Sequence, residues 1–284
     1  MMRALDRTIH ATLFRLVKDR LPTPPPHRYG GCRKRISDEV CFEGLLLRLT
    51  TGLAWEETIE YLMGYQVSDT TLRARRNEWI AAGVFDDLME HALAEYDRLI
   101  GIDTDHVSID GSSQLAPGGG EKTGNYPGSK GRLGFKWSCG VDAVGIGLGF
   151  VIDTGARNDY RLLRPTLDVI TARERTARIG TLHLDRGYGY KSLPERIDGY
   201  QITSVDVIAR NQPGEGRIQL VGFDRRWVVE RTNAWLTNFR QLKINWDRCV
   251  AHRHAAVCFA FAIITIYKLV DHINANQLPL ETIR

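Results

Sequence analysis

The chain has 284 residues, of which 43% are hydrophobic and 25% are charged. This composition excludes an intrinsically disordered protein, and the length predicts two domains. The net charge is only +4, but the charges are unevenly distributed. Residues 1–35 contain nine Lys or Arg and two acidic residues, residues 36–105 contain five Lys or Arg and fifteen acidic residues, and residues 224–254 contain seven Lys or Arg and three acidic residues. Concentrated positive charge suits a polyanionic partner; a solvated surface is the alternative.

The first third of the chain is predicted to be helical. Ile9, Leu13 and Leu16 have helical spacing, and TPPPHRYGGCRKR then predicts an extended basic arm because proline excludes a helix. Residues 36–99 predict a helical domain with Ser37 and Ser68 as N-caps. Helix, short turn and basic helix is the order of a helix-turn-helix, which predicts a third helix in a DNA groove; a plain bundle with a charged face is the alternative. The residues predicted to contact DNA there are Arg73, Arg75 and Arg76.

From residue 106 the pattern becomes rich in strands. Strands that alternate with helices predict an α/β sheet covered by helices. In chain order, the predicted elements are the strand HVSID, a hairpin of FKWSCGVDAVG and LGFVIDTGA, a helix RPTLDVITARER with Pro165 in its first turn, the strand ARIGTLHLD, a short helix SLPERIDGY, the strand SVDVIAR, a turn NQPGEG, and a helix from about 225 to 242.

The C-terminal apolar run, the start of the chain and the cysteines indicate in which cellular compartment the protein is expected. The longest apolar run, residues 255–267, is too short to span a bilayer, so a buried helix and no membrane role are expected. The start of the chain lacks the apolar core of a signal peptide. The five cysteines form no C-x-x-C pair and predict reduced thiols in a cytoplasm.

Three acidic residues stand out within these elements. Asp110 and Asp185 each end an apolar strand, and Glu230 lies with Asn233 on the polar side of an amphipathic helix. If they converge in space, their oxygens would bind a hard cation such as Mg²⁺ or Mn²⁺. The alternatives are ordinary Asp-Gly turns and a solvated helix face. His252 and His254 are two residues apart in HRH, so a helix would turn them to different faces and they are not expected to share a metal.

The segments ISDEVCFEGLLLRLTTGLAWEE, SIDGSS, LHLDRGY and RWVVERTNAWL occur in this order. Together they resemble the DDE transposases of bacterial insertion sequences, of the IS-five type. The resemblance implies a small all-α helix-turn-helix-like domain before an α/β, RNase H-like catalytic domain, a mixed sheet flanked by helices. It also implies that Asp110, Asp185 and Glu230 hold two Mg²⁺ or Mn²⁺ ions that cut and transfer DNA strands.

The same resemblance sets the expected organisation and partners. A basic arm (1–35), a helical DNA-binding domain (36–99) and a catalytic domain with C-terminal helices (100–284) are expected. The expected partners are the element's double-stranded ends and target DNA, with a homodimer in the DNA complex and a cytoplasmic, nucleoid-associated location. Related transposases often carry Lys or Arg where this chain has Thr237. Further predicted DNA contacts are Lys122, Lys130, Arg132, Arg226, Arg231, Arg240 and Lys243.

Two other functions remain open from the sequence. A stand-alone RNase H-like nuclease would need the same three acids but no sequence-specific N-terminal domain. A domesticated DNA-binding protein would need no catalysis, and the presence of Asp110, Asp185 and Glu230 argues against it.

Overall fold

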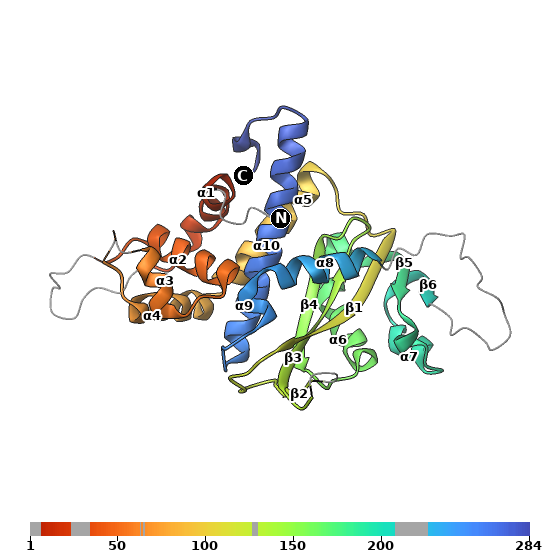
Figure 1. The fold of residues 1–284 in the computed structure, drawn as a ribbon. Coiled ribbons are helices and arrows are strands. Elements are labelled where there is room, and N and C mark those ends of the chain that lie inside the picture. The colour runs from red at the N-terminus through yellow and green to blue at the C-terminus, as the bar shows by residue number, and fades with distance from the viewer. Residues whose placement is uncertain (1–6, 24–34, 63, 65, 127–129, 208–226) are drawn as a thin grey trace. The chain divides into compact units, whose positions relative to one another are not determined.

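The computed structural model describes residues 7–23, 35–62, 64, 66–126, 130–207 and 227–284. The chain divides into two compact units, one made of residues 1–100 and 236–284 and the other of residues 101–235 (Figure 1). The C-terminal helices therefore belong with the N-terminal helices. This division differs from the expected one, in which the C-terminal helices are part of the catalytic domain (100–284).

The helical unit is built around its last long helix, α10 (Val250–Ala275). This helix is apolar on most of its circumference, and such a helix needs partners on all sides. Phe259 lies 5.1 Å from Phe42 and 5.6 Å from Phe85 between ring centroids. The other helices of this unit are α1 (Arg7–Val17), η1 (Lys18–Arg20), α2 (Asp38–Thr51), α3 (Trp55–Tyr61), α4 (Asp69–Ala81), α5 (Val84–Leu99), α9 (Arg240–Lys243) and η5 (Leu280–Thr282).

The predicted helix starts are confirmed by their caps. Ser37 Oγ accepts a hydrogen bond from Val40 N at 3.4 Å, and Ser68 Oγ accepts one from Thr71 N at 3.2 Å. These bonds satisfy amide groups that the first helical turn leaves without a partner. The order α3, short link, α4 is the one that the sequence predicted for a helix-turn-helix.

α10 is longer than the sequence analysis expected. It has 26 residues, enough by length and composition to cross a membrane, so the expectation that this segment is too short to span a bilayer is wrong, whereas the expected buried helix is confirmed. Within the most apolar 18-residue stretch of this helix, 78% is buried inside the protein. The apolar residues are thus used in the core of the helical unit.

The second unit contains a mixed sheet. Its path is β2-β3-β1-β5-β6, and β4 pairs with β3 (Figure 1). β1 is parallel to β5 and β5 to β6, whereas β3 is antiparallel to β1 and β4. This mixed sheet flanked by helices confirms the predicted α/β architecture. The elements are β1 (His106–Leu115), β2 (Gly124–Asn125), β3 (Leu133–Val141), β4 (Gly147–Thr154), α6 (Asp159–Thr171), η3 (Glu174–Thr176), β5 (Arg178–Leu184), η4 (Arg186–Tyr188), α7 (Leu193–Ile197), β6 (Gln201–Val207) and α8 (Trp227–Asn238), of which residues 227–235 lie in this unit.

Helices α6 and α8 cover opposite faces of this sheet. Ile170 of α6 lies so close to Gly140 that a Cβ there would be 2.2 Å from its Cδ1. Asn233 of α8 contacts the neighbouring Cys139, whose side chain points to the other face because strand side chains alternate. One face of the sheet therefore packs against α6 and the other against α8. Asp110 lies on the face covered by α8, because it is paired with Cys139 in the register of β1 and β3.

Two predicted helices have different bounds. α6 begins at Asp159, because the Asn158 side chain caps it by accepting from Tyr160 N at 2.9 Å. Pro165 therefore lies inside the helix, and its expected place in the first turn is wrong. The predicted helix 225–242 is two helices, α8 and α9, because Phe239 between them is extended. The NQPGEG turn, residues 1–6 and 24–34 of the basic arm, and Arg226 lie outside the described residues.

Candidate active site

Asp110 lies inside β1, which continues to Leu115, so its predicted place at the end of a strand is wrong. Asp185 directly follows β5, the parallel neighbour of β1, as predicted. The register of β1 and β5 pairs Val107 with Leu182 and Ser108 with His183. Continued by two residues, it sets Asp110 opposite Asp185. Neighbouring strands are about 4.8 Å apart, and residues directly paired have side chains on the same face. The two carboxylates thus share one face of the sheet, and both are half-buried.

A tight turn holds the Asp185 side chain. Asp185 follows the last residue of β5 with extended backbone angles, and its carboxylate accepts a hydrogen bond from Gly187 N at 2.6 Å. A Cβ on Gly187 would lie 2.7 Å from Asp185 Oδ1. The glycine in LHLDRGY is therefore needed for the close approach of this carboxylate to the chain.

Asp110 is oriented by Asn233 of α8. Trp137 Nε1 donates to Asn233 Oδ1 at 2.9 Å, and Asn233 Nδ2 donates to Asp110 Oδ2 at 3.3 Å. Because an indole N–H can only donate, the amide oxygen must face Trp137 and the amide N–H₂ must face Asp110. Asn233 is buried, although the sequence analysis had placed it on the polar side of this helix.

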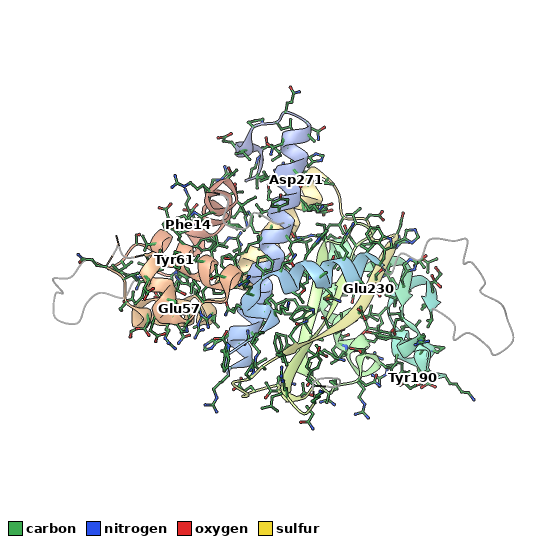
Figure 2. All side chains as sticks on the ribbon, in the orientation of Figure 1. Phe14, Glu57, Tyr61, Tyr190, Glu230 and Asp271 are labelled. Carbon is green, nitrogen blue, oxygen red and sulfur yellow. The ribbon has the colours of Figure 1, made fainter. Side chains whose placement is uncertain are left out.

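Glu230 lies one turn before Asn233 on α8 and is exposed (Figure 2). Residues three apart share a side of a helix, so Glu230 is on the side of α8 that reaches Asp110. Among the described residues, the one group of three His, Cys, Asp or Glu whose ligand atoms lie within 4.8 Å of one another is elsewhere. The three acids are on one side of the unit but are not gathered around a common point.

The turn between β3 and β4 fixes α8. Thr232 Oγ1 donates to Gly145 O at 2.8 Å, and Arg231 Nη2 donates to Val144 O at 2.6 Å. Gly145 has a φ of +90°, and a Cβ there would lie 2.8 Å from Thr232 Oγ1. The turn is itself held by Asp142, whose carboxylate accepts from Val144 N and Ile146 N. Burial raises the pKa of Asp142 to about 6, and these two hydrogen bonds act in the opposite direction.

Tyr188 is a buried neighbour of the acids that the sequence analysis missed. It is fully buried, and its hydroxyl has no hydrogen-bond partner among the described residues. Burial raises its pKa well above the ordinary value, and the negative charges of Asp159, Asp110 and Asp185 raise it further. The phenol therefore stays protonated. Its place in DRGY, three residues after Asp185, was the available signal.

Two histidines stand beside the aspartates on the same face. His106 Nδ1 and His183 Nε2 are 3.0 Å apart, and His183 Nδ1 lies 3.2 Å from Asp206 Oδ2. Asp206 is paired with His183 in the register of β5 and β6. Alternation along β1 and β5 puts both histidines on the face of the aspartates, and β6 supplies the partner of His183.

The carboxylates fit Mg²⁺ or Mn²⁺ by their chemistry. These ions prefer oxygen ligands, and Mg²⁺ is commonly held by one or two carboxylates together with water and substrate phosphates. Asp110 in β1 and Asp185 directly after β5 would supply such a pair.

The arginines of α4 have unequal exposure. The Arg75 side chain is 4% exposed and bonds to Asp38 and to Ile36 O. Arg76 is 12% exposed and bonds to Asp247 at 3.0 Å. Arg73 is 45% exposed, although it pairs with Asp69 at 3.1 Å. Of the three predicted DNA contacts, Arg73 presents the most charge to solvent.

The basic residues of the sheet unit also differ. Arg231 stacks on the rings of Trp227 and Trp235, and burial lowers its pKa. Lys122 and Lys130 have φ values of 52° and 53°, which are uncommon for residues other than glycine. The exposed predicted DNA contacts of the described chain, beside Arg73, are Lys122, Lys130, Arg132, Arg240 and Lys243, and Thr237 is half-buried.

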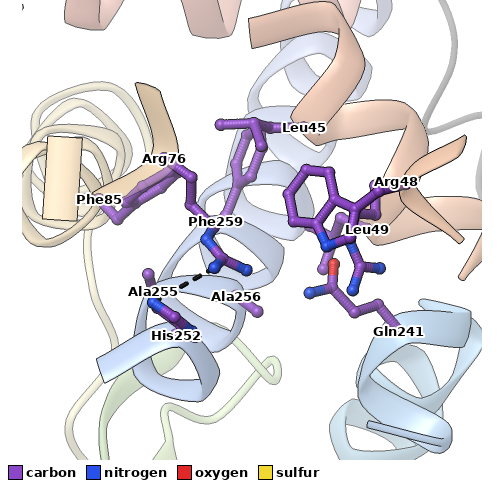
Figure 3. Close-up of a pocket in the computed structure, with 11 residues that line it drawn as sticks. Leu45, Arg48, Leu49, Arg76, Phe85, Gln241, His252, Ala255, Ala256 and Phe259 are labelled. Atoms are coloured by element: carbon purple, nitrogen blue, oxygen red, sulfur yellow. Dashed lines mark hydrogen bonds between the residues drawn. The ribbon is translucent and has the colours of Figure 1, made fainter. Parts of the chain in front are cut away.

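A small pocket lies in the helical unit, whereas these acids belong to the sheet unit (Figure 3). Arg48, Arg76 and His252 line it, with Arg76 Nη2 3.3 Å from His252 Nε2. Its volume of about 30 Å³ holds about one water molecule. It is too small for a nucleotide.

Comparison with known proteins identifies the family. Residues 101–266 match the family described as "Transposase DDE domain". The "Insertion element IS402 uncharacterized 16.2 kDa protein" of Burkholderia cepacia is 36% identical over 116 residues, which is 40% of this chain and 78% of that protein. The "Putative transposase for insertion sequence element IS402" of the same organism is 32% identical over 135 residues, 46% of this chain and 62% of that protein. The chain thus spans less than two thirds of this second relative.

Among solved structures, the cryo-EM structure of the piggyBac transposase synaptic complex with hairpin DNA is 10% identical, with a TM-score of 0.49 over 100% of this chain and 79% of that chain. A likeness this low carries no inference about this chain. The family match, by contrast, spans more than half of the sequence, and both relatives come from an insertion element. The chain belongs to the DDE transposases of bacterial insertion sequences.

Proposed function

We propose that this transposase, which we assign to the IS-five type, binds the terminal inverted repeats of its element and cuts and transfers DNA strands at Asp110, Asp185 and Glu230. The register of β1 and β5 carries this proposal, because it sets two carboxylates on one face of a sheet. Glu230 would complete the site from α8, on the same helix side as Asn233.

Two Mg²⁺ or Mn²⁺ ions, when bound, would polarise the attacking and the leaving oxygens of the phosphodiester. The protein's part is to hold the ligands still. Asn233 keeps the Asp110 carboxylate turned toward the site, and Gly187 N fixes that of Asp185. Such supporting bonds orient metal ligands and tune their affinity.

The partners follow from the reaction. Exposed basic side chains, led by Arg73, Lys122 and Lys130, would contact phosphates of the element's ends and of the target DNA. An element has two ends, so two copies of the chain would act in one complex. The site of action would be the bacterial cytoplasm, on the nucleoid.

The test compares Asp185→Asn with Asp198→Asn, an exposed acid outside the site. Asp185→Asn keeps the size of the side chain but removes one ligand charge. We expect Mg²⁺-dependent cleavage to fall by several orders of magnitude. Binding to the terminal repeats, measured by gel shift, should persist in both variants.

Three outcomes would reject the proposal. Near-normal cleavage by folded Asp185→Asn would remove Asp185 from the site. Cleavage without preference for the terminal repeats would indicate a stand-alone nuclease. Repeat binding by the wild type with no metal-dependent cleavage would indicate a DNA-binding protein without catalysis.

A further inference from the structure

A second cluster of ligand atoms lies in the helical unit, outside the proposed active site. It consists of Asp86 in the first turn of α5 and of His254 and Cys258 near the start of α10. Their ligand atoms lie within 4.8 Å of one another. His254 and Cys258 are four residues apart, so they share one side of α10.

The distances within this cluster are close to those of a tetrahedral metal site. Cys258 Sγ is 3.4 Å from His254 Nε2 and 3.7 Å from Asp86 Oδ1, and His254 Nε2 is 2.7 Å from Asp86 Oδ1. Zinc bonds of roughly 2.0–2.3 Å at tetrahedral angles separate neighbouring ligand atoms by about 3.3–3.6 Å. The two distances to sulfur already fit, and the contact between His254 and Asp86 would have to widen by about 0.6 Å.

An ion pair alone explains only part of this arrangement. An aspartate in the first turn of a helix is favoured by the helix dipole, and His254 is a suitable partner for it. The hydrogen bond to His254 and the charge of its imidazole lower the pKa of Asp86, although burial acts against them. Neither effect accounts for a buried thiol within reach of both groups.

The exposure of the cluster allows an ion to enter. Cys258 is 2% exposed, whereas the side chains of His254 and Asp86 are 41% and 60% exposed. An ion would therefore sit between the thiol and the solvent, with its fourth position open to water. A thiolate, an imidazole and a carboxylate together suit Zn²⁺, whereas Mg²⁺ prefers oxygen ligands.

We propose that Asp86, His254 and Cys258 form a zinc site that joins α5 to α10. Binding would displace the proton of the Cys258 thiol and leave a thiolate on the ion. The site is separate in chemistry from the proposed carboxylate site, and it would act by stabilising the helical unit. His252, the other histidine of HRH, is turned to Arg76 and takes no part.

The 284-residue chain, freed of metal by a chelator that is then removed, would be titrated with Co²⁺ in excess Mg²⁺. We expect the near-ultraviolet charge-transfer band of a Co²⁺–thiolate bond and the visible bands of four-coordinate Co²⁺, both abolished by Zn²⁺. Cys258→Ser should lose the charge-transfer band. His254→Ala and Asp86→Asn should weaken Co²⁺ binding at least tenfold. Cys249→Ser, which changes a thiol outside the cluster, should bind as the wild type does.

Zn²⁺ should also raise the melting temperature of the wild type and of Cys249→Ser, but not that of Asp86→Asn. Because the Asp86 side chain is exposed, Asp86→Asn is expected to fold. Absence of a thiolate band, a band that survives Cys258→Ser, or unchanged affinity in Asp86→Asn would overturn the proposal. Asp185→Asn should keep the band, so failure of this site and failure of the proposed DNA chemistry are distinguishable.

Discussion

The amide of Asn233 donates a hydrogen bond to the carboxylate of Asp110, 3.3 Å away, while its oxygen accepts one from the indole of Trp137. The helix that carries Glu230 is thus joined through one side chain to the strand that carries Asp110. Substitutions at Asn233 can therefore distinguish its contribution to protein stability from its contribution to catalysis.

Asn233→Asp keeps an acceptor for Trp137 but removes the donor to Asp110 and places a second carboxylate beside it. We expect Mg²⁺-dependent cleavage to fall about 10- to 100-fold, because supporting bonds of this kind tune metal ligands. Asn233→Leu also leaves the buried Trp137 N–H without an acceptor, at a cost of about 1–3 kcal/mol. Cleavage assays and chemical denaturation of both variants provide the measurement. Equal cleavage by Asn233→Asp and the wild type would contradict a positioning role.

Gly145→Ala tests the docking of α8 on the turn between β3 and β4. The added Cβ would collide with Thr232 Oγ1, and the φ of +90° disfavours any side chain. We expect a lower melting temperature and weaker cleavage, since α8 must shift and carry Glu230 with it.

The matched control for this change is Gly199→Ala. Gly199 has a φ of +88° with nothing within 4 Å of an added Cβ, so it reports the backbone cost alone. Both variants should lose stability, but only Gly145→Ala should lose cleavage measured well below the melting temperature. Equal cleavage by the two variants would show that the turn does not position Glu230.

Asp142 should make the stability of the sheet unit depend on pH. Its pKa is raised to about 6 in the folded protein, above an ordinary value of 3.8, so the folded state holds the proton more tightly. Stability should therefore fall as the pH rises from about 4 to about 6, and the loss should stay constant above that range. A shift of this size corresponds to on the order of 2–3 kcal/mol. Asp142→Asn should flatten the profile and raise stability at pH 7, as followed by urea denaturation across this range; an unchanged profile would contradict the buried acid as its source.

Arg73→Ala and Arg75→Ala should have different effects despite their proximity on α4. Arg73 is half-exposed, so its loss should leave the melting temperature unchanged and reduce the log-log salt dependence of DNA binding by about 0.9. Arg75 is buried and pairs with Asp38, so its loss should lower stability by about 1–3 kcal/mol. Affinity titrations at several salt concentrations and thermal melting distinguish the two. A salt slope unchanged by Arg73→Ala would remove this residue from the DNA interface.

The strands of the site could be predicted because their signal is local. Alternation in HVSID and TLHLD was enough to predict both strands and the end of β5 just before Asp185, but not that β1 continues past Asp110 to Leu115. The pairing of β1 with β5 could not be read from either segment, because it depends on contacts about 75 residues apart. A helical wheel placed Asn233 with the polar residues, but it could not show that a buried tryptophan would meet that side.

The distribution of charge along the sequence predicted the DNA-binding residues less reliably than alternation predicted the strands. The arginines of α4 suggested a DNA-binding face, yet Arg75 and Arg76 are mostly taken up by acids of the same unit. Asp247, the partner of Arg76, is 171 residues away in the sequence. A count of charges along one segment cannot include partners that only the fold brings to it.

The placement of α10 in the core of the helical unit has a consequence for synthesis on the ribosome. The helices up to α5 end at Leu99, whereas α10 begins at Val250. At bacterial translation rates the intervening residues take roughly 10–30 s to make. During that interval the apolar surface of α5, including Phe85, has no α10 to cover it. Nascent chains should therefore bind chaperones until the last long helix emerges, and messages cut short before codon 250 should yield protein that aggregates.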